Sequence, residues 1–137
     1  MTVRQAKSWL SIGWLVVILP LLFILVLRQL NGFYGSDPKD VWSWFSQFVL
    51  PALTLLAGAF TVSASPNDQR PVENPLVFWA AVALSVVYVA LIYLVVANQA
   101  ASAQPWNEQL KESALFLGVI QALVIGVLGK FFIESSR

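Results

Sequence analysis

Three uncharged polar side chains lie inside long apolar stretches of this chain, and they are its first candidates for chemistry within a membrane. Gln47, Thr54 and Gln121 each fall in a run without any Asp, Glu, Lys or Arg. A polar side chain in lipid finds its partner on another helix, and such a bond contributes about 0.6–2 kcal/mol. We interpret these residues first as contacts that hold helices together. The alternative is that they line an aqueous path.

The residue types that most often carry catalysis are missing. The chain has no cysteine and no histidine, which removes thiol nucleophiles, Ser–His and Cys–His pairs and the thiolate or imidazole ligands of most metal sites. No charged residue falls in the middle of an apolar run, whereas proton and ion paths usually need one. Lys130, near the end of the last run, is interpreted as reaching the headgroups with its charged end. We predict a protein that is not an enzyme and that binds neither a metal nor a cofactor.

Four uncharged stretches must position these residues, and they cover 8–27, 41–67, 74–107 and 113–129. A bilayer core of about 30 Å is crossed by roughly 20 apolar residues of helix. The sequence therefore predicts an all-α integral membrane protein, a four-transmembrane-helix bundle with short loops, as one membrane domain over 1–137. The expected helices run over about 9–27, 41–62, 75–97 and 113–133.

Composition and charge agree with that class. Hydrophobic residues make up 58% of the chain and charged residues 11%, and the mean hydropathy is +0.75, which excludes an ordinary soluble globule. The net charge of +1 comes from scattered residues, so nucleic acid is not an expected partner.

The basic residues predict an orientation. If the N-terminus is cytoplasmic, basic residues on the inner side outnumber those on the outer side, as the positive-inside rule requires. The inner set is Arg4, Lys7, Arg70, Lys130 and Arg137, and the outer set is Arg28, Lys39 and Lys111. We expect a multi-pass protein of a bacterial inner (cell) membrane with both termini in the cytoplasm.

Small residues repeat along one face of three predicted helices. The clearest case is Gly118-x-x-x-Ala122-x-x-x-Gly126, in which all three residues lie on one helix face. Helices in lipid approach one another closely along such faces. The full set of expected packing or oligomerisation residues is Gly118, Ala122, Gly126, Ala83, Ala90, Ala57 and Gly58.

These features lead to one main functional hypothesis and two alternatives. The main hypothesis is a non-catalytic subunit that assembles, anchors or regulates a membrane complex, with the lipid bilayer and another membrane protein or a second copy as partners. The first alternative is a self-oligomerising pore or membrane-perturbing effector, as in bacterial defence or toxicity. A small carrier of a neutral substrate is the second alternative, which the missing intramembrane charge disfavours.

Overall fold

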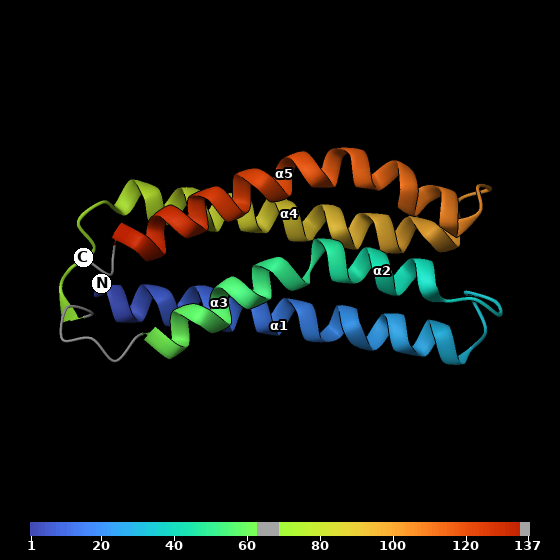
Figure 1. Ribbon diagram of the computed structural model, residues 1–137, viewed down its shortest axis with the longest axis horizontal. Coiled ribbons are helices and arrows are strands. Elements are labelled where there is room, and N and C mark those ends of the chain that lie inside the picture. The colour runs from blue at the N-terminus through green and yellow to red at the C-terminus, as the bar shows by residue number, and fades with distance from the viewer. Residues whose placement is uncertain (63–68, 135–137) are drawn as a thin grey trace.

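The computed structural model of this chain describes residues 1–62 and 69–134, and within them it is a bundle of five helices (Figure 1). The only extended pairing among the described residues is an isolated bridge between Thr2 and Pro71. The helices are α1 (Val3–Leu30), α2 (Lys39–Phe48), α3 (Leu50–Val62), α4 (Pro75–Ala101) and α5 (Trp106–Glu134). The all-helical class is thus as the sequence predicts.

α1 is longer than the expected 9–27 because both of its ends are capped. At the start, the Thr2 side chain accepts from the Gln5 backbone N–H and the Gln5 side chain accepts from the Thr2 N–H, which is a capping box. Hydropathy alone does not register this polar first turn, which is why the expected helix begins only at Trp9.

A glycine turn ends α1 and folds the chain back over it. The Gly32 N–H donates to the Gln29 carbonyl at 3.0 Å and the Phe33 N–H donates to the Arg28 carbonyl at 2.9 Å. This pair of bonds is a Schellman motif, and Gly32 adopts the left-handed φ of 73° that the motif requires. The glycine turn brings the Phe33 ring back to the Arg28 guanidinium, which belongs to the last helical turn of α1.

The single helix expected over 41–62 is two helices in the structure, which is a correction to the sequence analysis. α2 ends at Phe48 and α3 begins at Leu50, with a bend of 40° between them. Pro51 explains the break, because its ring nitrogen carries no hydrogen and cannot donate to the Gln47 carbonyl four residues earlier.

The last two helices also exceed their expected bounds of 75–97 and 113–133. α4 begins at Pro75, which suits a first helical position, and continues through the alanine-rich segment to Ala101. α5 begins directly after Pro105, whose carbonyl accepts from the backbone N–H groups of Glu108 and Gln109. The apolar run therefore marks only part of each helix, and polar turns extend both helices at the end where the loop between α4 and α5 lies.

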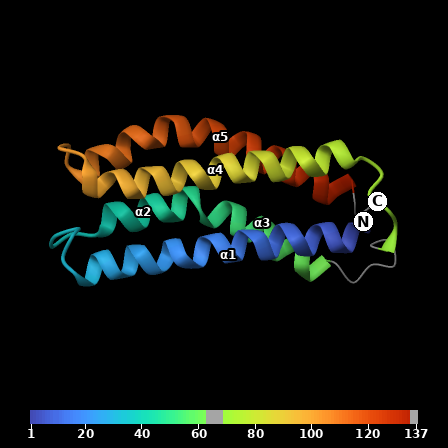
Figure 2. The same cartoon turned by 180° about the vertical axis from the view of Figure 1, so that it is seen from behind.

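The helices form a ring in the order α1, α4, α5 and the α2–α3 pair, which returns to α1. Figures 1 and 2 show α1 and α4 running in one direction, while α2–α3 and α5 run in the other. The start of α1 and the end of α5 consequently lie at the same end of the bundle (Figure 1).

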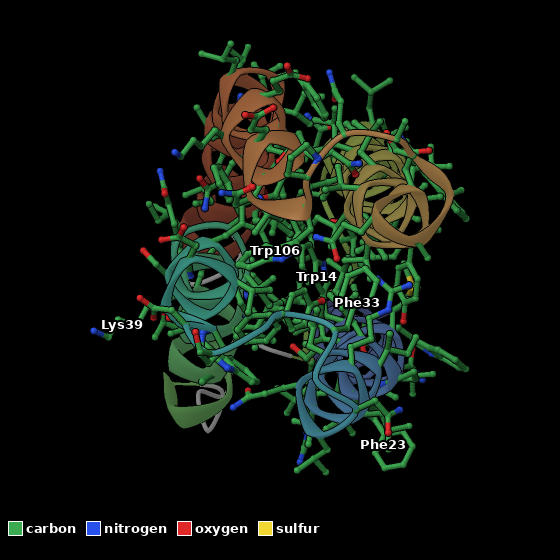
Figure 3. The ribbon with its side chains drawn as sticks, turned by 90° about the vertical axis from the view of Figure 1, so that its right-hand side faces the viewer. Trp14, Phe23, Phe33, Lys39 and Trp106 are labelled. Carbon is green, nitrogen blue, oxygen red and sulfur yellow. The ribbon has the colours of Figure 1, made fainter. Side chains whose placement is uncertain are left out.

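Large side chains fill the centre of the ring. Viewed along the bundle, Trp14 and Trp106 project between the helices, whereas Phe23 and Lys39 project outward (Figure 3). The outer surface is also apolar, with Phe23 64% exposed, as expected where lipid takes the place of water. Three helices, α1, α4 and α5, are long and apolar enough to cross a membrane, and the bent α2–α3 pair makes up to four.

Candidate functional site

The small residues singled out in the sequence lie on the outside of the bundle or at its edge. Gly118 is half-buried, and the other six are exposed: Ala122, Gly126, Ala83, Ala90, Ala57 and Gly58. Near Gly58, Gly118 and Gly126 no atom lies within 4 Å of the position that a Cβ would occupy. Apart from half-buried Gly118 at the edge, the members of this set on α4 and α5 therefore face outward from the bundle.

On α5 the small residues form a groove with a matching ridge beside it. The groove consists of Gly118, Ala122 and Gly126, and we call it the α5 groove. Leu115, Val119 and Leu123 follow the same four-residue spacing one row away, and all three are exposed, at 78%, 66% and 55%. Rows spaced by four residues are the ridges and grooves through which two helices interlock. The surface of α5 thus has the ridge and groove of a helix-packing face. Among the described residues, no helix packs against that face.

The break between α2 and α3 receives hydrogen bonds from two other helices. The Gln121 side-chain N–H donates to the Gln47 carbonyl at 2.7 Å, and the Tyr88 hydroxyl donates to the Phe48 carbonyl at 2.7 Å. Both carbonyls come from the last turn of α2, where Pro51 cannot continue the helical hydrogen-bond pattern. α5 and α4 therefore each supply one donor to the broken helix.

The other two intramembrane polar residues do not join that contact through their side chains. The Gln47 side chain is exposed, so only its backbone carbonyl meets Gln121. The Thr54 hydroxyl bonds within its own helix, to the carbonyls of Leu50 at 2.7 Å and Pro51 at 3.0 Å. The structure thus brings Gln121 to the backbone of Gln47 and leaves Thr54 apart, facing outward.

Inside the bundle, polar side chains are joined in separate pairs across helices. The Trp14 indole N–H donates to the Ser85 hydroxyl at 3.1 Å, and the Trp44 indole N–H donates to the Ser113 hydroxyl at 3.0 Å. Both pairs are buried, and the Tyr88 ring lies 6.2 Å from the Trp14 ring. Bulky rings and paired hydroxyls therefore occupy the centre, where a water-filled path through one chain would have to run.

A polar cluster lies at the end of the bundle where α1 ends and α4 passes into α5, and no pattern in the sequence indicates it. The Arg28 guanidinium donates to the Val96 carbonyl and to the Gln99 side-chain oxygen, and the Tyr34 hydroxyl donates to the same oxygen at 3.1 Å. Burial raises the pKa of the Tyr34 phenol, while the nearby Arg28 charge opposes that shift. The phenol keeps its proton at neutral pH and remains a donor. These residues come from α1, the following turn and α4, so no local spacing reveals them.

The described residues contain no group of three acidic side chains placed to hold a metal ion. No protein family, curated protein or solved structure matched this chain in the comparisons with known proteins. A functional conclusion must therefore come from the geometry of the bundle.

Proposed function

We propose that this chain is a non-catalytic subunit of a membrane protein complex that docks onto a partner membrane protein through the α5 groove. In this proposal the chain crosses a bacterial cell membrane four times, with both termini in the cytoplasm. The observation that carries the proposal is the open groove and ridge on α5, on a bundle whose own interior is closed.

The arrangement of α2 and α3 supports the fourth crossing. The pair begins beside the end of α1 and runs back along the bundle towards the start of α1 (Figures 1 and 2). A broken helix is stable within a bilayer only where other groups satisfy its freed carbonyls. Gln121 and Tyr88 do this at the break. The basic residues Arg4 and Lys7 lie in the first turns of α1, at the end that the positive-inside rule assigns to the cytoplasm.

The choice of α5 over α4 as the docking face rests on backbone access. The α4 alanines at 83 and 90 are exposed but are seven residues apart, and each carries a Cβ. The α5 groove has small residues at every fourth position, two of them glycines with open space beside them. A partner helix can approach the backbone more closely there.

A partner protein also fits the geometry better than a lumen does. A pore would require several copies with polar faces turned inward, yet the Thr54 hydroxyl is already bonded to its own backbone. The interior of one chain is filled by rings such as Trp14 and Tyr88. Self-oligomerisation is therefore the competing outcome of the test.

The proposal is tested by placing a photoreactive amino acid at Ala122 in the native host and illuminating intact membranes. We expect a cross-linked product with a different membrane polypeptide, because the partner backbone would lie against this groove. The matched control is the same amino acid at Ala90, an exposed alanine on α4, which should react with lipid. Cross-links from Ala122 only to lipid, or only to a second copy of this chain, would refute docking to a partner protein.

A further inference from the structure

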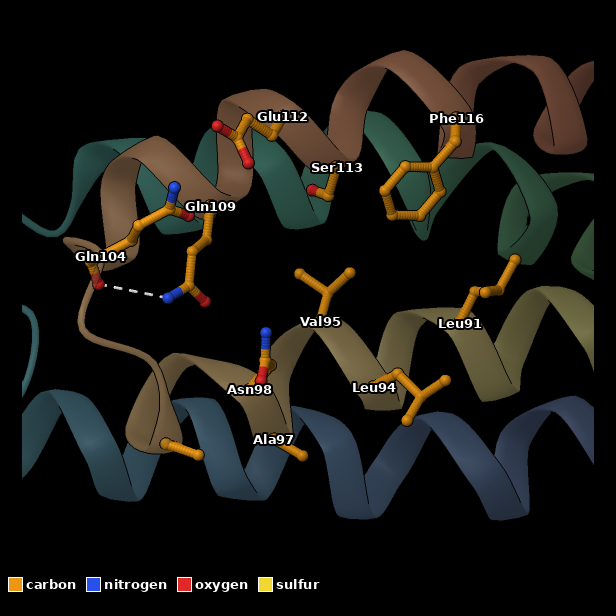
Figure 4. A pocket seen from close by; sticks show the side chains of 11 residues that line it. Leu91, Leu94, Val95, Ala97, Asn98, Gln104, Gln109, Glu112, Ser113 and Phe116 are labelled. Carbon is orange, nitrogen blue, oxygen red and sulfur yellow. Dashed lines mark hydrogen bonds between the residues drawn. The ribbon is translucent and has the colours of Figure 1, made fainter.

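A cleft opens between α4 and α5 at the end of the bundle where the loop between these helices lies (Figure 4). Its volume is about 530 Å³, which is large enough for a small molecule or part of a lipid. Leu94 and Phe116 are among the residues that line it, and they are 63% and 43% exposed. The cleft therefore opens towards the surroundings of the bundle, on a different side of α5 from the α5 groove.

One polar atom in this cleft is buried and has no partner. Gln109 is 8% exposed, its side-chain N–H donates to the Gln104 carbonyl at 3.2 Å, and its side-chain oxygen Oε1 accepts nothing. The Gln104 carbonyl fixes the orientation of the amide, because the reverse orientation would place two oxygens against each other. Figure 4 shows this oxygen directed into the space between the helices. A buried acceptor without a donor is costly, so the position is suited to a ligand that supplies an N–H or O–H group.

The charge at the same end of the cleft specifies the ligand further. Glu112 lines the cleft one turn along α5 from Gln109. Among the described residues, Glu112 has no hydrogen bond or ion pair. A carboxylate and an unpaired amide oxygen together favour a cationic hydrogen-bond donor, of which a primary ammonium is the simplest. Asn98 on the facing wall offers a further amide at this level.

The remainder of the cleft is apolar and elongated. Its α4 wall extends from Leu91 to Ala101 and its α5 wall reaches Phe116. Ten residues of helix correspond to about 15 Å, which is comparable with half of the hydrocarbon core. Half-buried Trp106 at the start of α5 indicates the headgroup level beside the polar end, because aromatic side chains concentrate there. An ammonium at this level with an acyl chain below it would occupy both parts of the cleft.

We propose that the cleft between α4 and α5 binds a phospholipid with a primary ammonium headgroup, of the phosphatidylethanolamine type. The ammonium donates to Gln109 Oε1 and pairs with the Glu112 carboxylate, and one acyl chain lies against the apolar wall. A choline headgroup has the same charge but no N–H donor, so it cannot satisfy Gln109. This binding site is independent of the docking face on α5 and of whether a partner is present.

Native mass spectrometry of the purified full chain, with phosphatidylethanolamine or phosphatidylcholine of identical acyl chains, tests this proposal. We expect about a tenfold preference for phosphatidylethanolamine, the size of effect that one charge-assisted hydrogen bond supports. Gln109→Leu, which nearly keeps the size of the side chain but removes the acceptor, should reduce that preference to about twofold or less. Glu112→Gln should weaken the retention of both lipids, because both headgroups carry a positive charge. The matched control is Glu108→Gln on the same helix, an exposed residue outside the cleft lining, which should leave both the retention and the preference unchanged.

Each other outcome overturns the proposal. Equal retention of the two lipids would show that only the acyl chains are recognised. A preference that survives Gln109→Leu would place the ammonium elsewhere. Competition by glycerophosphoethanolamine, which has the headgroup without acyl chains, at concentrations similar to those of the lipid would identify the ligand as a soluble amine rather than a lipid.

Discussion

Replacing Gly126 with leucine is expected to separate this protein from its partner without unfolding it. The added side chain would occupy the α5 groove, and forcing extra atoms into a packed helix contact costs about 1–3 kcal/mol. That cost corresponds to a loss of affinity of about 5- to 150-fold. The bundle itself should tolerate the change, because a Cβ at Gly126 meets nothing within 4 Å and leucine forms helix more readily than glycine does.

The measurement is the amount of partner that co-purifies with the tagged chain in mild detergent. Gly13→Leu is the matched control, since Gly13 is also exposed in a long apolar helix and also has open space at its Cβ position, but it lies on α1. Both variants should reach the membrane in wild-type amounts. An undiminished yield of partner with Gly126→Leu, or an equal loss with Gly13→Leu, would exclude the α5 groove as the docking face.

The second large effect is expected at the helix break, where Gln121→Leu should destabilise the bundle by about 1–2 kcal/mol. Leucine has a similar size but no donor, so the Gln47 carbonyl would lose the bond that it receives from Gln121. The free energy of unfolding, measured by titrating SDS into mixed micelles, gives this cost. Thr54→Val is a suitable control, because the Thr54 hydroxyl bonds only to carbonyls of its own helix, and its removal should have a smaller effect.

A second substitution shows whether Pro51 is the cause of that dependence. In a Pro51→Ala background, residue 51 regains a backbone N–H that can donate to the Gln47 carbonyl and close the helix. The cost of Gln121→Leu should then fall to within about 0.5 kcal/mol of zero, the margin within which independent changes add. An equal cost in both backgrounds would mean that Gln121 stabilises the bundle by some other contact.

The all-helical class and the approximate positions of the helices could be predicted from the sequence, because the stretches without charge are long and the charged residues lie in the short segments between them and at the two ends. The ends of the helices could not. The capping box at Thr2 and the glycine turn at Gly32 depend on side-chain and backbone hydrogen bonds that hydropathy does not register. Pro51 lies within the uncharged stretch 41–67. Its consequence depends on donors more than 35 residues away, because Tyr88 and Gln121 bond to Phe48 and Gln47 across 40 and 74 positions.

Which way a helix face points could not be predicted either, and the reason is physical. In a soluble protein the apolar face turns inward, but in lipid both the interior and the surroundings favour apolar side chains. The stripes of small residues on α4 and α5 were therefore equally consistent with packing inside the bundle, yet nearly all of their residues are exposed. The Arg28–Tyr34–Gln99 cluster could not be predicted, because its members come together only in the folded bundle.

The claim that this chain is a subunit of a membrane complex is tested most directly by the intact mass of the particle that contains it. The particle would be extracted from native membranes in mild detergent and weighed, and its polypeptides identified. We predict that this chain is accompanied by at least one other membrane polypeptide at a fixed stoichiometry. A particle that holds only copies of this chain, or a lone monomer, would contradict the proposed function.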